Sequence, residues 1–174
     1  MQPYPLVIRT AGVDDILLLC SIARQTFLDA FDKLNDPEDN HSFINEHFTT
    51  DKIRESLLTP GVIYLLAFVK QQPVGYAKLS NHEIPSAFKK ATPIKMEKLY
   101  FLKSFTGKGL GEKLFRYCTQ WASLHGYSHI WLFVWDRNLP ALRFYDRLGF
   151  TPFGQDVQIV GSDVQIAIMM QKKI

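Results

Sequence analysis

The chain has 174 residues, 47% of them apolar, which is enough for one well-packed domain and too few for two of ordinary size. Its formal charge of +3 is mild, and its lysines and arginines are scattered, which argues against a nucleic-acid-binding surface. No apolar run approaches the roughly 20 residues that a membrane-spanning helix needs, and residues 1–10 lack the pattern of a signal peptide. We therefore expect a single cytoplasmic domain over residues 1–174 that binds neither nucleic acid nor membrane.

Cysteine and histidine usage gives no sign of a disulfide framework or a metal centre. Cys20 and Cys118 lie in separate apolar helical patterns, which favours buried thiols in a reducing compartment. The five histidines include no pair at metal-ligand spacing and no Cys-x-x-Cys companion. No metal is expected.

The first half of the chain predicts a strand, three helices and a β-hairpin. Apolar residues recur at helical spacing from Ile16 to Phe31, with Thr10 or Asp14 as a candidate cap, and acids accompany Pro37 at the start of the next helix. The predicted elements are a strand over 6–9, helices over 16–31, 37–48 and 51–59, and antiparallel strands over 62–70 and 73–80.

The second half predicts one crossover between parallel strands, followed by a helix and a closing hairpin. The predicted elements are a strand over 94–102, a helix from 110 to about 126, a strand over 127–135, a helix over 138–147, and strands over 151–160 and 164–171 around the turn 161–163. This order indicates a three-layer α/β domain around a mixed, twisted sheet rather than a doubly wound sheet.

A glycine run, Thr106-Gly107-Lys108-Gly109-Leu110-Gly111, joins the strand that ends near Leu102 to the following helix. A helix N-terminus presents unpaired N–H groups and a partial positive charge, and glycine has no Cβ to hold an anion away. The run therefore predicts a phosphate-binding cradle. Its G-x-G-x-G spacing matches neither a dinucleotide-binding motif nor a P-loop, and a tight strand-to-helix turn would explain the glycines equally well.

Together with Asn138 and the segment Phe144-Tyr145-Asp146-Arg147-Leu148-Gly149-Phe150, this order of elements resembles the GNAT superfamily of acetyl-CoA-dependent N-acetyltransferases over essentially the whole chain. Residues 130–138 and 160–165 look most like bacterial spermidine/spermine-type acetyltransferases. The resemblance implies the three-layer GNAT fold, acetyl-CoA as acetyl donor without a metal, and a small amine acceptor. Homodimers are common among relatives, and a homodimer is expected here by that analogy alone.

The family's phosphate motif, [Arg/Gln]-x-x-Gly-x-[Gly/Ala], falls on residues 106–111, where both glycines match and Thr106 departs from the pattern. Loss of that long side chain would weaken coenzyme A binding unless Lys103 or Lys108 supplies the charge. The resemblance also implies that the strand segment 99–101 binds the pantetheine arm as an added strand, for which the strands at Leu99 and Val134 must diverge, usually by a bulge. The implied cofactor-binding residues are Leu99, Tyr100, Phe101, Thr106, Gly107, Lys108, Gly109, Leu110, Gly111, Glu112, Asn138 and Tyr145.

Acetyl transfer from a thioester to an amine needs a deprotonated amine, a stabilised oxyanion and a proton for the departing thiolate. Tyr145 matches the family position for that proton donor, although packing against the sheet would also explain an aromatic residue there. Glu97 matches a carboxylate that serves as a base in several relatives, and a strand-surface carboxylate paired with Lys95 or Lys98 explains it equally well. Asn138 could cap its helix, contact the cofactor, or do both.

The charge pattern of the first two helices bears on the acceptor. Acidic residues gather in the first two helices, where they would favour a polycationic amine such as a polyamine, or would simply form a solvated helical face. They are Asp29, Asp32, Asp36, Glu38, Asp39 and Glu46, with Lys33 the only nearby base. The leading hypothesis is acetylation of a small polyamine-like amine by direct attack in a ternary complex. The alternatives are acetylation of a protein N-terminus or lysine, and a CoA-sensing module that has lost turnover.

Overall fold

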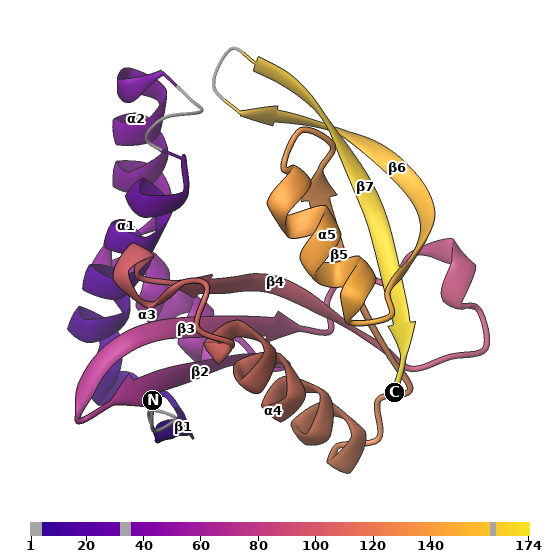
Figure 1. Cartoon of the computed structure of the whole chain (residues 1–174), viewed down its shortest axis with the longest axis horizontal. Coiled ribbons are helices and arrows are strands. Elements are labelled where there is room, and N and C mark those ends of the chain that lie inside the picture. Colours follow the sequence, from indigo (N-terminus) through magenta and orange to yellow (C-terminus); the bar gives the residue numbers. More distant parts are fainter. Residues whose placement is uncertain (1–4, 32–35, 161–162) are drawn as a thin grey trace.

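A mixed sheet of seven strands runs through the part of the chain that the computed structural model describes, residues 5–31, 36–160 and 163–174 (Figure 1). The strands and helices are β1 (Leu6–Thr10), α1 (Ile16–Phe31), α2 (Pro37–His47), α3 (Thr50–Leu58), β2 (Val62–Val69), β3 (Gln72–Ser80), β4 (Pro93–Phe101), α4 (Leu110–Leu124), β5 (His129–Trp135), α5 (Leu139–Arg147), β6 (Thr151–Val160) and β7 (Asp163–Lys173). Single 3-10 turns lie at Val13–Asp15, Ser86–Phe88 and Lys103–Phe105. Every predicted strand and helix is present within a few residues; residues 161 and 162 of the predicted last turn lie outside the described part.

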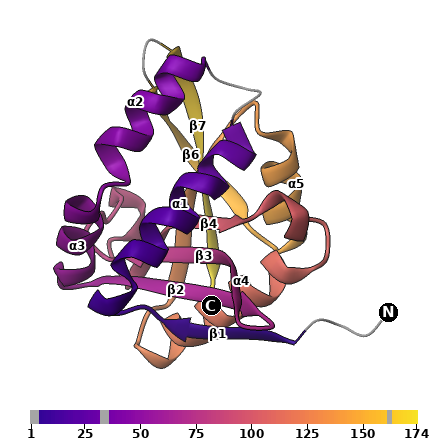
Figure 2. The same ribbon diagram turned by 90° about the vertical axis from the view of Figure 1, so that its left-hand side faces the viewer.

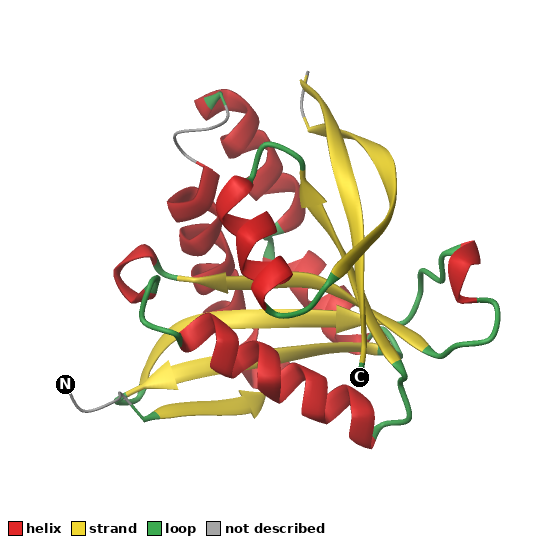
Figure 3. Ribbon diagram, turned by 45° about the vertical axis from the view of Figure 1, so that its right-hand side comes forward, coloured by secondary structure: helices red, strands yellow, loops and turns green. Residues whose placement is uncertain are grey.

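The strand order is β1-β2-β3-β4-β5-β7-β6, and only β4 and β5 are parallel neighbours. Helix α4 is therefore the one crossover between parallel strands in the described sheet, as the sequence predicted. The predicted three-layer α/β fold is confirmed, because helices cover both faces of the strands (Figure 3).

Each face of the sheet has its own apolar core. Helices α1, α2 and α3 pack through Leu19, Phe27, Ile44 and Ile53 on one face, and Figure 2 shows α1 and α3 in front of the strands. Helix α4 buries Leu110, Leu114, Phe115 and Cys118 on the other face, with Ala141, Leu142 and Tyr145 of α5 packed against them. Burial of these residues on folding removes apolar surface from water and stabilises the domain. Cys20 and Cys118 are both buried and unbridged, as expected.

Strands β4 and β5 pair along only three residues and then separate. Their parallel register runs from Pro93 opposite His129 to Lys95 opposite Trp131. On its other edge β4 stays paired with β3, but the register shifts so that Glu97 is an extra residue opposite the junction of Lys78 and Leu79. Such a bulge bends its strand, and Figure 1 shows β5, β6 and β7 turning away from β4. The divergence expected between the strands of Leu99 and Val134 is present.

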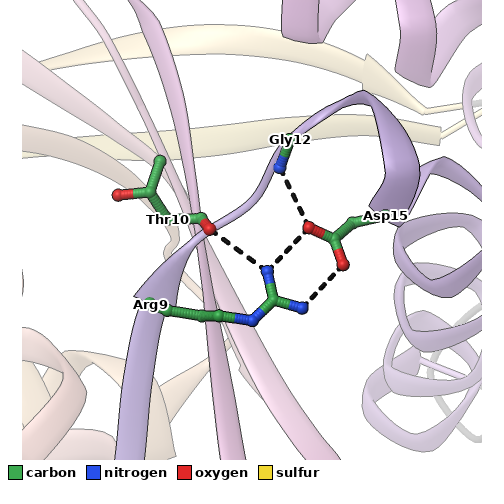
Figure 4. Close-up of polar contacts among 4 residues, drawn as sticks. All are labelled: Arg9, Thr10, Gly12 and Asp15. Carbon is green, nitrogen blue, oxygen red and sulfur yellow. Dashed lines mark hydrogen bonds and ion pairs between the residues drawn. The ribbon is translucent and has the colours of Figure 1, made fainter.

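The start of α1 differs from the prediction, because neither Thr10 nor Asp14 caps it. A 3-10 turn follows Gly12 and leads into α1, and the Asp15 carboxylate accepts a hydrogen bond from the Gly12 N–H at 2.9 Å. Arg9 donates to both Asp15 oxygens at 2.7 Å and to the Thr10 carbonyl at 3.2 Å (Figure 4). The charge and hydrogen bonds of Arg9 lower the pKa of Asp15, so its carboxylate ties the first strand to the first helix.

We expect Asp15→Asn to lower the free energy of unfolding at pH 7 by about 1–2 kcal/mol, because it removes the ion pair and weakens the cap. The pKa of Asp15 is lowered on folding, so its contribution is complete above its ordinary value of about 3.9 and is lost as the pH falls through the folded value. The free energies of unfolding of wild type and variant should therefore differ at pH 7 and become similar in acid. Urea unfolding at both pH values measures this change. Asp14→Asn removes the same charge from an exposed neighbour; an equal loss in that control would contradict the assignment.

Candidate active site

A cleft of about 640 Å³ lies between the end of β4, the glycine run at the start of α4, and helix α5. All the residues predicted to bind the cofactor line this cleft except Lys108 and Leu110. The structure adds lining residues that were not among the predicted cofactor-binding residues, although the sequence had offered Lys103 as a source of charge and Asp29 as part of an acidic acceptor side. These are Asp29, Ala30, Lys103, Phe105, Pro140, Ala141, Phe144 and Arg147.

The glycine run has the geometry of an anion cradle. Gly107 and Gly109 adopt left-handed backbone conformations, with φ of 72° and 73°, and a Cβ on either would project into open space. Gly109 is the N-cap of α4, so the N–H groups of the first helical turn have no carbonyl one turn earlier to bond. The turn thus requires glycine for its conformation and also leaves room for a phosphate. The two interpretations of the run are compatible.

Two of the predicted positions are not among the residues that line the cleft. Leu110 is only 2% exposed in the α4 core, so its backbone N–H alone can serve a ligand. The Lys108 ammonium lies 5.2 Å from the ring centroid of Phe105. The cations that line the cleft are instead Lys103, which the sequence offered as a candidate, and Arg147, which it did not.

Tyr145 and Asn138 each combine a structural role with a place in the cleft. Tyr145 packs edge-on against Phe150, with ring centroids 5.3 Å apart, and burial raises the pKa of its phenol. The phenol is therefore protonated at neutral pH, as a proton donor must be. The Asn138 side chain caps α5 by accepting a hydrogen bond from the Ala141 N–H at 3.2 Å. Each residue thus has the structural role that the sequence offered for it and also lines the cleft, and its role toward the cofactor stays a prediction.

Glu97 lies outside the cleft, in a neighbouring cavity of about 700 Å³ that we call the Glu97 pocket. It forms an ion pair with Lys78 of β3 at 2.6 Å, so its partner is neither Lys95 nor Lys98 as the sequence suggested. Burial raises the pKa of Glu97, but the hydrogen bond and charge of Lys78 outweigh it and the net pKa is lowered. The pocket is lined by Phe43, His47, Phe48, Lys52, Ile53, Glu55, Ser56, Thr59, Val62, Tyr64, Tyr76, Lys78, His82, Glu83, Glu97 and Lys98.

Among the described acidic residues of the first two helices, only Asp29 lines either cavity. Asp29 lines the cleft, but its carboxylate is occupied by hydrogen bonds from Gln25 at 2.9 Å and from the Lys103 N–H at 2.7 Å. Asp36 caps α2 by accepting from the Glu38 N–H at 2.8 Å. Three further acids, Glu38, Asp39 and Glu46, line neither cavity, and Asp32 and Lys33 lie outside the described residues.

Comparison with known proteins decides the family. The model of the acetyltransferase (GNAT) family matches residues 23–150. The chain belongs to the GNAT family. It is 31% identical over 160 residues to an uncharacterized N-acetyltransferase of Lactobacillus delbrueckii subsp. lactis, covering 92% of each chain.

Solved structures show the same fold. The PaiA N-acetyltransferase of Thermoplasma acidophilum, solved in complex with coenzyme A, has a TM-score of 0.81 at 22% identity, covering 98% of this chain and 99% of that one. YncA of Salmonella typhimurium, solved with acetyl-CoA, has a TM-score of 0.66 at 20% identity and covers 97% and 94%.

This GNAT protein is an acetyl-CoA-dependent N-acetyltransferase. Its cleft fits that donor, because the open space beside Gly107 and Gly109 can accept phosphates and the cations Lys103 and Arg147 stand on the same walls. Among residues 5–31, 36–160 and 163–174, no group of three or more His, Cys, Asp or Glu side chains could hold a metal ion. In the same described ranges, no helix is both long and apolar enough to cross a bilayer.

We expect Gly109→Ala to weaken coenzyme A binding by about tenfold or more, because the new Cβ enters the cradle and strains a left-handed residue by roughly 1–2 kcal/mol. Gly126→Ala is the matched control. It has a φ of 82° and open space at its Cβ but follows the other end of α4. Calorimetric titration and thermal melts should show similar strain in both variants and lost affinity only in Gly109→Ala.

Because Thr106 replaces the long polar side chain of the family motif, we expect Arg147 to neutralise part of the negative charge of the cofactor's phosphates. Arg147→Gln is expected to weaken coenzyme A binding about three- to tenfold at low salt and less at high salt. Arg143→Gln removes the same charge from an exposed position on α5 that does not line the cleft. Equal affinities for Arg143→Gln and Arg147→Gln in titrations at two salt concentrations would refute this role.

Proposed function

We propose that this enzyme acetylates the primary amine of a small acceptor by direct attack while both substrates are bound. This proposal is supported by one observation: the glycines of residues 107–111 and Tyr145 line the same cleft. A covalent acetyl-cysteine has no support, because Cys20 and Cys118 are buried and neither lines that cleft.

Acetyl-CoA supplies the acetyl thioester, and the proposal assigns the remaining tasks to this chain. The amides at the start of α4, with Lys103 and Arg147, would hold the phosphates, while the β4 segment Leu99–Phe101 would hold the extended arm through its backbone. The Tyr145 hydroxyl would protonate the departing thiolate, since its phenol is neutral at pH 7 and lines the same cleft as the glycine run. Burial raises the pKa of Tyr145 and so makes the phenol a weaker acid. Asn138 would fix the start of α5 through its N-cap hydrogen bond, and so help to hold Tyr145 of the same helix at the cleft.

For Glu97 we propose a role on the acceptor side. Its carboxylate is held as an anion by Lys78 and lines the pocket next to the cleft. It could take the proton of an alkylammonium, whose pKa is about 10.4, through an intervening water. The lowered pKa of Glu97 makes it a weak base, so its main contribution would be to attract and orient the cationic acceptor before proton loss.

The size of the Glu97 pocket favours a small acceptor over a folded protein surface, because an open pocket of about 700 Å³ between α2, α3 and β2–β4 suits a small molecule. The resemblance to spermidine/spermine-type enzymes supports a polyamine. Of the described acidic residues that also favoured one, Asp29 accepts from the Lys103 N–H, Asp36 caps α2, and none lines the Glu97 pocket. The proposal therefore names a small primary amine and keeps a polyamine as one member of that class.

The test follows free thiol release from acetyl-CoA with a panel of amines and peptides. Tyr145→Phe should lower kcat about a hundredfold or more and leave coenzyme A affinity within about twofold. Glu97→Gln should lower kcat/KM with a smaller effect on kcat. Tyr117→Phe is the control, since Tyr117 packs against the same core but does not line the cleft. Cofactor binding without turnover on any acceptor would overturn the proposal and favour a CoA-sensing module, and turnover on peptides alone would favour a protein acetyltransferase.

A further inference from the structure

Within the described residues, not every charged side chain around the Glu97 pocket has a partner of opposite charge. Three carboxylates line it, and each has a lysine against it: Glu97 with Lys78 at 2.6 Å, Glu55 with Lys52 at 3.7 Å, and Glu83 with Lys95 at 2.6 Å. Each of these acids is therefore already paired with a lysine of this chain.

Lys98 is the exception among the lining lysines. In the part of the chain that the structure describes, no carboxylate forms an ion pair with it, and its ammonium lies 5.7 Å from the ring centroid of Phe43. Burial lowers the pKa of Lys98 to about 8, and the charge of Lys78 adds to this while Glu97 opposes it. A desolvated cation without a counter-ion is stabilised when an anion binds beside it.

The position of Lys98 connects it to the reaction centre. Side chains two residues apart in a strand share a face, about 7 Å apart, so Lys98 and Tyr100 lie on one face of β4. Tyr100 lines the cofactor cleft, and its ring centroid is 6.2 Å from that of Tyr76, which lines the Glu97 pocket. The Glu97 pocket and the cofactor cleft are therefore neighbours along β4, with Lys98 lining the one and Tyr100 lining the other.

We propose that the acceptor amine also carries a carboxylate, and that Lys98 binds this carboxylate in the Glu97 pocket while the amine points along β4 toward the cofactor cleft. The aromatic rings of Phe43, Tyr64 and Tyr76 would enclose the aliphatic part of such an acceptor. This inference rests on the proposed function and narrows it: the preferred acceptors are small amino acids with a free primary amine, in preference to polyamines, which have no anion for Lys98.

The experiment compares amines that differ only by a carboxylate: lysine with cadaverine, ornithine with putrescine, and 6-aminohexanoate with pentylamine. Thiol release from acetyl-CoA gives kcat and KM for each. The wild type should prefer the carboxylate-bearing member of at least one pair by about tenfold or more in kcat/KM, mainly through KM.

Three variants separate a binding role from a structural one. Lys98→Met keeps the length of the side chain and removes its charge, so it should abolish the preference and leave the amine without a carboxylate within about twofold. Lys98→Arg should retain most of the preference. Lys52→Met, which removes an exposed lysine already paired with Glu55, should leave it unchanged. Removal of a desolvated charge should not lower the melting temperature of Lys98→Met.

Two results would overturn the inference while the proposed function stands. One is turnover with no preference for any carboxylate-bearing amine, and the other is a preference that survives in Lys98→Met. If no amine is turned over, the proposed function fails instead. Calorimetric titration of the same amines into the coenzyme A complex then decides the question, because carboxylate-dependent binding that Lys98→Met abolishes supports the inference and its absence overturns it.

Discussion

The separation of β4 from β5 is the constraint on which the rest of the site depends. Parallel pairing stops at Lys95 and Trp131, and the extra residue Glu97 bends β4 away while its pairing with β3 continues. Beyond this point the edge of β4 that would face β5 has backbone groups without strand partners. An extended ligand can bond such an edge as an additional strand would. The bulge therefore leaves this edge of β4 open and sets the position of Glu97.

A close approach between β3 and β4 holds this bent strand in place. Gly75 lies opposite Phe101, and a Cβ at Gly75 would lie 2.6 Å from the Tyr100 carbonyl oxygen and 2.7 Å from the Phe101 ring. Only glycine lets β3 support β4 at this distance. The Leu102 N–H then donates to the Val74 carbonyl at 2.8 Å, which extends the attachment to the start of the glycine run.

Several cleft residues stabilise the fold and serve the cofactor cleft at the same time. Asp29 of α1 accepts from the Lys103 N–H, so the first helix fixes the loop that leads into the cradle. Asn138 caps α5, and Tyr145 packs on Phe150 of the core while it lines the cleft. Because the same contacts hold the fold and the cleft, their geometry is set before any ligand binds, which is the preorganisation that catalysis exploits.

The sequence by itself determined the features that arise from local physics. Helical and strand periodicity gave the order of elements, and the glycine run marked a tight strand-to-helix turn, in which Gly107 and Gly109 are left-handed in the structure. The tertiary structure alone decided the pairing of Glu97 with Lys78, the place of Arg147 in the cleft, and the contact between Asp29 and Lys103, which are 74 residues apart. These depend on strand register and on the bulge, and a one-residue shift in register changes which side chains share a face. No local pattern fixes that register, so the acceptor side of the site became visible only in the fold.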